Sequence, residues 1–195
     1  MKFSVNQKDL QQSLGFCQGV IEKRSTLPIL SNILLEAYNS KLKITATDLD
    51  LIFINEINDV EVIEEGKTTT TSSTLYDIIR KFSSGKKINF NLTTENKIQL
   101  ESEKSVFNLN CMSADEFPLM EENFTENEFV LKSKQFLKLL SKCKFSISTD
   151  ETRHYLSGIY FHQTQVDDKH YLTAAATDSH RTVSYTHLRA HETVS

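Results

Sequence analysis

The hydrophobic positions between residues 129 and 147 change their period part-way along the segment. Phe129 and Leu131 alternate with polar neighbours, which is typical of a short strand entering a core. From Ser133, which we expect to cap the helix, apolar residues recur every three or four positions and predict a helix with one buried face. The residues on that face are Phe136, Leu139, Leu140, Cys143 and Ile147.

The opposite face of this helix is basic. Lys134, Lys138 and Lys142 are spaced four residues apart and therefore line up along the helix. No acidic residue interrupts this lysine row in the sequence. Spacing alone favours a solvated helix face, since most charge runs simply contact water. The other interpretation is a surface that faces a polyanion.

The same strand-then-helix pattern occurs once earlier in the chain. When residue 3 is placed under residue 129, the apolar positions of the two segments coincide. The matched pairs are Phe3 with Phe129, Val5 with Leu131, Leu10 with Phe136, Leu14 with Leu140, Cys17 with Cys143 and Ile21 with Ile147. After four extra residues in a turn, the match resumes between 42–48 and 172–178. Internal similarity in the same order indicates one domain type used twice.

The pattern along the chain predicts an α+β fold. Residues 2–57 have the pattern of a β-α-β-β-β unit, and residues 67–110 repeat it, with a helix capped by Ser72 or Ser73 and ended by Gly85. We expect domains built from two such units, with the helices on one face of antiparallel sheets. Residues 1–121 form a complete domain, 122–128 an acidic linker, and 129–181 the first half of a second domain, with strands around 155–163 and 171–177.

Composition limits the function without deciding it. The 195 residues carry a formal net charge of −4, and 38% are hydrophobic. No apolar run has the length of a membrane span or a signal peptide, so we expect a cytoplasmic protein. Three isolated cysteines favour reduced core thiols over disulfides or a metal site. The acidic balance argues against a protein that coats nucleic acid with most of its surface, but it permits one basic face.

Six separate motifs, in order, resemble the bacterial sliding clamp, the β subunit of DNA polymerase III. They are Met1-Lys2-Phe3, Arg24-Ser25-Thr26-Leu27-Pro28-Ile29-Leu30, Thr47-Asp48-Leu49, Asp115-Glu116-Phe117-Pro118, Arg153-His154-Tyr155-Leu156-Ser157-Gly158 and Ala176-Thr177-Asp178-Ser179-His180-Arg181. The resemblance covers residues 1–181. It implies the DNA-clamp (processivity) fold, in which two chains of three domains close into a homodimer ring around duplex DNA, with the helices facing the hole.

The resemblance also implies partners and site residues. The partners are double-stranded DNA of any sequence, the DNA polymerase III catalytic subunit and the clamp loader, and neither catalysis nor a cofactor is implied. The expected DNA-binding residues are Arg24, Arg80, Lys81, Lys134, Lys138, Lys142, His154 and Tyr155. Ser73 and Asp150 stand where the family has an arginine and a glutamine near the DNA. The expected pocket for partner peptides is lined by Leu156, Thr177, His180 and Arg181, and Ser179 replaces a common glycine.

Two other interpretations come from different functional classes. Asp48 and Asp50 form an Asp-x-Asp pair that could bind a metal in a small hydrolase or transferase, although a turn between strands explains the pair better. A stand-alone DNA-binding module is the third possibility, and the acidic balance disfavours it. His154, His162 and His170 lack a recognised metal-ligand spacing.

The end of the chain departs from the family pattern. Residues 182–195 look like a translated transposon-type sequencing adapter, and we interpret them as a non-native tail. His187 and His191, four residues apart as zinc ligands can be, lie in this segment. Without a third domain and the second half of its second domain, we expect the chain to be a fragment that cannot form the ring alone.

Overall fold

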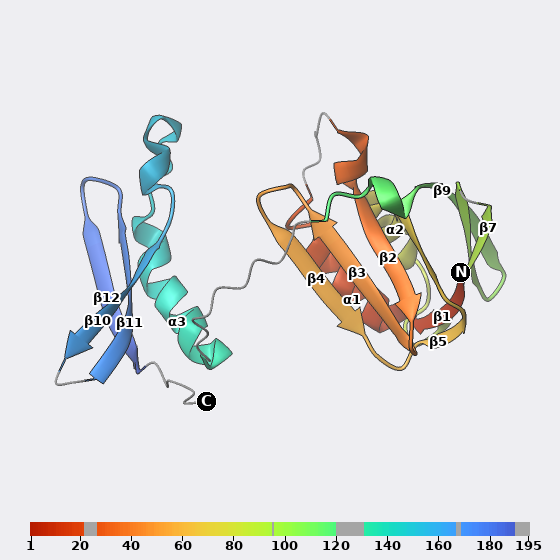
Figure 1. The fold of residues 1–195 in the computed structure, drawn as a ribbon, viewed down its shortest axis with the longest axis horizontal. Coiled ribbons are helices and arrows are strands. Elements are labelled where there is room, and N and C mark those ends of the chain that lie inside the picture. Colours follow the sequence, from red (N-terminus) through yellow and green to blue (C-terminus); the bar gives the residue numbers. More distant parts are fainter. Residues whose placement is uncertain (22–26, 95, 120–130, 167–168, 190–195) are drawn as a thin grey trace. The chain divides into compact units, whose positions relative to one another are not determined.

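The computed structural model describes residues 1–21, 27–94, 96–119, 131–166 and 169–189 (Figure 1). Contacts between residues divide the chain into unit 1, Met1–Glu122, and unit 2, Asn123–Ser195. Within the described ranges, no helix is both long and apolar enough to cross a membrane.

Unit 1 contains two interleaved halves. The first half consists of β1 (Lys2–Asn6), α1 (Gln7–Cys17), the 3-10 helix η1 (Pro28–Ser31), β2 (Asn32–Tyr38), β3 (Lys41–Thr47), β4 (Ile52–Ile57) and β5 (Glu61–Glu64). The second half consists of β6 (Gly66–Thr71), α2 (Ser72–Ile79), β7 (Lys87–Thr94), β8 (Lys97–Ser102), β9 (Ser105–Met112) and the 3-10 helix η2 (Ala114–Glu116). The expected α+β fold is confirmed, with one added strand, β5.

The strand order shows how the two halves depend on each other. The sheet runs β4-β3-β2-β6-β9-β8-β7-β1-β5, with antiparallel neighbours throughout. The first strand of each half therefore pairs within the other half: β1 lies beside β7, and β6 lies beside β2. Neither half completes its sheet without the other.

Helices α1 and α2 cover one face of this sheet, behind β2, β3 and β4 in Figure 1. The predicted inward positions of α1 are confirmed, because Leu10, Leu14 and Cys17 are fully buried. Burying a leucine side chain fully stabilises a fold by about 1.5–3 kcal/mol. The helices are also joined by a polar contact, since the Gln18 side-chain amide donates to Ser72 Oγ at 2.7 Å.

Unit 2 has one helix over a three-stranded sheet. Its elements are α3 (Ser133–Cys143), the 3-10 helices η3 (Lys144–Ser146) and η4 (Glu151–Leu156), β10 (Tyr160–Val166), β11 (Lys169–Thr177) and β12 (Thr182–Arg189). The sheet order is β10-β11-β12 (Figure 1). Leu139 and Cys143 are fully buried and fix α3 to β11 and β12, as α1 packs on β3 and β4 in unit 1. The internal repeat predicted from the sequence therefore extends to helix packing.

The segment set aside as a foreign tail contributes a strand in the structure. The antiparallel pairing of β12 with β11 runs from Thr177 opposite Thr182 to Tyr171 opposite Arg189. β12 thus takes the place in unit 2 that β4 has in unit 1. The expectation that no strand follows residues 171–177 is therefore wrong. The non-native origin of residues 182–195 stays a prediction. The predicted domain bounds also stay predictions.

The expected helix ends were placed wrongly by one or more residues. Ser133 is the first residue of α3, and its N-cap position is Lys132, without a side-chain cap hydrogen bond. Thr71, rather than Ser72 or Ser73, is the N-cap of α2. α2 ends at Ile79, and Gly85, with φ +79°, serves the turn before β7 instead of ending the helix.

The predicted strand around residues 155–163 is wrong over its first half. β10 begins at Tyr160, whereas Tyr155 lies in η4. Asp150 starts η4 because its side chain accepts a hydrogen bond from the Thr152 backbone N–H. The strand predicted around Phe129 and Leu131 falls largely outside the described residues.

Candidate nucleic-acid interface and peptide pocket

The lysine row of α3 projects into solvent. Lys134, Lys138 and Lys142 are all exposed and lie on the side away from the buried Leu139 and Cys143. Among the ion pairs formed by described residues, none involves these three lysines. No carboxylate of the described residues forms an ion pair with them, and the row presents three cations along one helix face.

The predicted cations of unit 1 form a weaker feature. Arg80 and Lys81 are exposed, but they follow the last residue of α2 instead of lying on the helix. Arg80 Nε lies 3.4 Å from Asp77 Oδ1, so a neighbouring carboxylate partly offsets its charge. Arg24 lies outside the described residues. The structure thus places two of the three predicted unit 1 cations at a single turn.

The segment η4 presents a second pair of predicted contact residues. His154 and Tyr155 are both exposed, Tyr155 by 73%, and their rings meet edge to face with centroids 6.0 Å apart. A strand would have turned neighbouring side chains to opposite faces. The 3-10 segment lets both project from unit 2.

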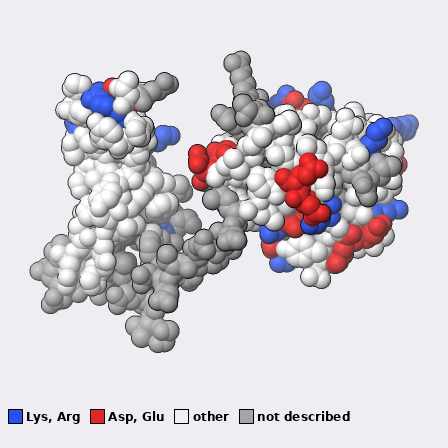
Figure 2. Space-filling model, turned by 45° about the horizontal axis from the view of Figure 1, so that its top comes forward, with Lys and Arg blue, Asp and Glu red and all other residues white. Residues whose placement is uncertain are grey.

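Cations and aromatic rings meet at the end of unit 2 that carries η4. Figure 2 shows lysine and arginine atoms there, on a unit whose visible surface otherwise carries few charges. Lys142 and Lys144, at the end of α3 and the start of η3, are exposed. Beside them Phe145 is 55% exposed, and Arg181 Cζ lies 5.5 Å from the centre of its ring. A cation over an aromatic face is stabilised by the ring quadrupole.

The turn between β11 and β12 brings three predicted pocket residues together. Thr177 Oγ1 accepts from the Ser179 N–H at 3.2 Å and donates to the Arg181 carbonyl at 2.8 Å. Asp178 Oδ1 accepts from the backbone N–H groups of His180 and Arg181, at 3.0 and 2.9 Å. These bonds stabilise the charged form and lower the pKa of Asp178 to about 2. The carboxylate is therefore a fixed structural group of the turn.

Unit 1 contains the same turn between β3 and β4. Thr47 Oγ1 accepts from the Leu49 N–H at 3.0 Å and donates to the Leu51 carbonyl at 2.9 Å. Asp48 Oδ1 accepts from the N–H groups of Asp50 and Leu51, at 3.0 and 2.7 Å. Asp48 of the Asp-x-Asp pair thus has the same role in the turn as Asp178 has in unit 2. His180 stands in unit 2 where Asp50 stands in unit 1, so the turn forms without a second aspartate. This supports the turn explanation of Asp48.

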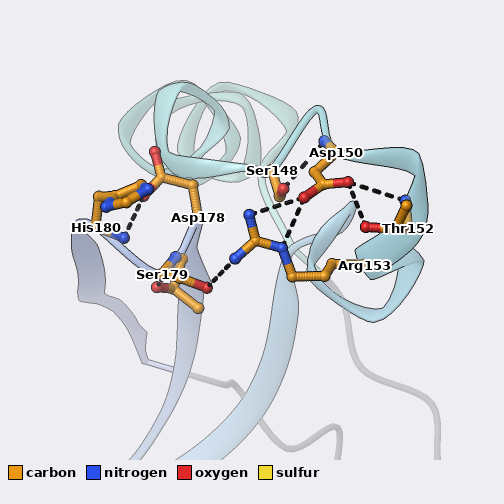
Figure 3. A network of polar contacts seen from close by, with 8 residues as sticks. Ser148, Asp150, Thr152, Arg153, Asp178, Ser179 and His180 are labelled. Carbon is orange, nitrogen blue, oxygen red and sulfur yellow. Dashed lines mark hydrogen bonds and ion pairs between the residues drawn. The ribbon is translucent and has the colours of Figure 1, made fainter.

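The fourth predicted pocket residue ends the η4 segment, which contacts this turn through Arg153. Leu156, half-buried, ends η4, and its carbonyl accepts from the Ser148 N–H at 3.0 Å. Arg153, three residues earlier, donates from Nη1 to Ser179 Oγ at 3.0 Å (Figure 3). In the sequence, Arg153 and Ser179 stand out only as members of two separate motifs, and their contact is not predicted. A bond between residues 26 positions apart leaves no local signal in the sequence.

Comparison with known proteins places this arrangement in a family. Residues 1–121 match the family described as DNA polymerase III beta subunit, N-terminal domain, and residues 130–193 match its central domain. The chain belongs to the DNA polymerase III beta subunit family. This confirms the resemblance found in the sequence. The match to the central domain extends into the segment that we had set aside.

Individual clamps are similar over almost the whole chain. The Beta sliding clamp of Caulobacter vibrioides is 36% identical over 182 residues, which are 93% of this chain and 49% of that protein. The solved structure of Caulobacter crescentus pol III beta superposes with a TM-score of 0.91 at 34% identity, covering 98% of this chain and 52% of that one. A Bartonella birtlesii clamp bound to griselimycin gives 0.88 at 34% identity, covering 98% and 50% of the two chains. The chain thus spans about half the length of these relatives.

Proposed function

We propose that the protein containing this chain is a DNA sliding clamp. It encircles duplex DNA irrespective of sequence and tethers the DNA polymerase III catalytic subunit, without catalysing a reaction itself. In this proposal it forms a homodimer ring in the cytoplasm, opened by a clamp loader. The observation that carries the proposal is the exposed lysine row of α3, free of acidic partners among the described residues, on a helix packed as α1 is packed.

The electrostatics of the lysine row support sliding. A lysine held roughly 8 Å from a phosphate across water gains only about 0.5 kcal/mol, before screening over a Debye length of about 8 Å. No single contact of this size holds the DNA at one position. Attraction to phosphates carries no sequence information, so it permits movement along the duplex. Retention then comes from the closed ring.

We propose that partner peptides bind at Leu156 of η4 and at Thr177, His180 and Arg181 of the turn after β11. Leu156 supplies an apolar floor, and the turn after β11 supplies polar groups at its edge, which suits a peptide of mixed side chains. The Bartonella clamp was solved bound to griselimycin. We infer that griselimycin also binds this chain, once the chain is extended to the length of its relatives. We propose Leu156, Thr177, His180 and Arg181 as its site.

Retention on DNA tests the clamp proposal. A protein extended to the length of its relatives, loaded by a clamp loader, is expected to stay on closed circular DNA and to be released when the circle is cut. Equal loss from circular and linear DNA contradicts encirclement. The 195-residue chain alone is expected to elute as a monomer in size-exclusion chromatography and to be lost from both DNAs. A metal-dependent activity abolished by Asp48→Ala would instead support the enzyme interpretation.

A further inference from the structure

One arginine joins the two loops at the end of unit 2 (Figure 3). Arg153 donates from Nε and Nη2 to Asp150 Oδ2, both at 2.8 Å, and from Nη1 to Ser179 Oγ at 3.0 Å. We call these three residues the Arg153 bridge. Asp150 and Arg153 belong to the η4 segment, whereas Ser179 lies in the turn between β11 and β12.

The η4 end of the bridge is itself held in place. Asp150 Oδ1 accepts from the backbone N–H and the hydroxyl of Thr152, at 3.0 and 2.6 Å. This leaves Oδ2 for the guanidinium, whose Nε and Nη2 both donate to that single oxygen. The bonds from Thr152 and Arg153 lower the pKa of Asp150 to about 2, so the carboxylate is charged at neutral pH. The Asp150 carboxylate, itself held by Thr152, therefore orients the Arg153 guanidinium toward Ser179.

Unit 1 shows that the turn does not require a bridge. The corresponding turn there has Leu49 in the place of Ser179, with φ of +80° and +75° for the two residues and the same pattern of hydrogen bonds. By the repeat offset, Leu27 stands where Arg153 stands in unit 2. Two leucine side chains cannot form a polar bridge. The turn thus folds on its own bonds, and the Arg153 bridge adds a constraint that folding does not need.

The added constraint lies between the two sides of the proposed peptide pocket. Leu156 follows Arg153 on η4, whereas Thr177, His180 and Arg181 flank Ser179 in the turn. We propose that Arg153 is a positioning residue for peptide binding, which holds the turn against η4 so that the pocket is preformed. A preformed surface loses less conformational entropy when a ligand binds. This inference rests on the proposed peptide pocket.

Griselimycin binding measures the effect of the bridge. In the protein extended to the length of its relatives, we expect Ser179→Ala and Arg153→Gln each to weaken binding about three- to tenfold by isothermal titration calorimetry. Ser179 is exposed, so Ser179→Ala should change the melting temperature little, whereas Arg153→Gln also loses the Asp150 ion pair and should lower it slightly. Amide hydrogen exchange in residues 177–181 should become faster in both variants. Removal of a contact that only stabilises the two loops would raise this local exchange but leave griselimycin binding unchanged.

Two further variants keep the outcomes distinct. Leu49→Ala alters the matching turn of unit 1 and should leave griselimycin binding unchanged. Leu156→Glu places a charge on the pocket floor and should abolish binding. Loss of binding in Leu156→Glu, together with binding within twofold of wild type in Ser179→Ala and Arg153→Gln, overturns the bridge inference and leaves the pocket standing. Unchanged binding in Leu156→Glu, or no binding by the wild type, overturns the pocket itself.

Discussion

Removing the lysine row of α3 perturbs the proposed DNA interface without disturbing the fold. The change is Lys134→Ala, Lys138→Ala and Lys142→Ala together. All three side chains are exposed and form none of the ion pairs found among described residues, so no partner is left unpaired. Alanine is the best helix former, and α3 stays anchored by Leu139 and Cys143. We therefore expect the triple variant to be as stable as the wild type and to bind DNA more weakly.

The expected size of the effect depends on salt. Three lysines at roughly 8 Å from phosphates contribute about 1.6 kcal/mol before screening. A Debye length of about 30 Å at 0.01 M salt leaves about 1.2 kcal/mol, and about 8 Å at 0.15 M leaves about 0.6 kcal/mol. The triple variant should lose about sevenfold in DNA affinity at low salt and about threefold at 0.15 M. If the lysines instead contacted phosphates directly, the slope of log K against log salt would flatten by about 2.7.

A chemical-shift titration of the isotope-labelled chain with a 20-base-pair duplex measures both the affinity and the location. The matched control removes three lysines elsewhere, through Lys41→Ala, Lys67→Ala and Lys87→Ala. Each of these lysines pairs with a carboxylate, at 2.9, 2.6 and 3.1 Å respectively. The control changes the net charge by the same amount as the triple variant. It should leave the salt slope of DNA binding close to that of the wild type, because a carboxylate already offsets the charge of each of these lysines.

Two outcomes refute the reasoning. If the salt slope of the triple variant equals that of the wild type, DNA does not lie against α3. If the control lowers the affinity as much as the triple variant does, net charge alone accounts for binding and the lysine row has no special place.

Two further predictions concern unit 2. Leu139→Ala empties a fully buried position and should destabilise unit 2 by about 2–4 kcal/mol, whereas Leu137→Ala, at a site that is 62% exposed, should change stability by less than about 0.5 kcal/mol. Calorimetry resolves this, and equal losses in both variants contradict the packing described. Asp150 and Asp178 have pKa values lowered to about 2, so their contribution to stability is complete above about pH 4 and is lost as the pH falls toward 2. The melting temperature should therefore fall between pH 5 and pH 2, and Asp178→Asn should make this fall smaller. A melting temperature that does not change with pH contradicts the prediction.

Period and repetition predicted which side of each helix is buried. Leu10, Leu14 and Cys17 of α1, and Leu139 and Cys143 of α3, are all buried. A helix of 11 residues repeats its pattern often enough to define a face. The repeat then correctly placed α3 on its sheet, because equivalent apolar positions need equivalent strands beneath them.

The missed features lack such repetition. The 3-10 helix η4 has only six residues, with Arg153 in a non-helical conformation at φ −116° and ψ 52°, so no period is established. The Arg153–Ser179 bond depends on how two loops meet, which no local pattern encodes. β12 is not predicted because its residues are interpreted as a foreign tail. Their alternation of apolar and polar side chains would otherwise indicate a strand. The predicted helix starts differ by a residue or two because serine is a favoured N-cap residue, whereas Thr71 and Lys132 hold the N-cap positions here.

Photocrosslinking to duplex DNA tests most directly whether α3 faces the nucleic acid. The three native cysteines are buried, and burial raises the pKa of the Cys17 thiol to about 12, so an introduced surface cysteine can be labelled selectively. Lys138→Cys places the label on the lysine row. Tyr160→Cys places it at a site 69% exposed on the opposite face of the sheet, because the adjacent Phe161 stacks against Phe136 of α3. In the protein loaded on DNA, the label at position 138 should crosslink and the label at 160 should not; crosslinking from 160 and none from 138 contradicts the account.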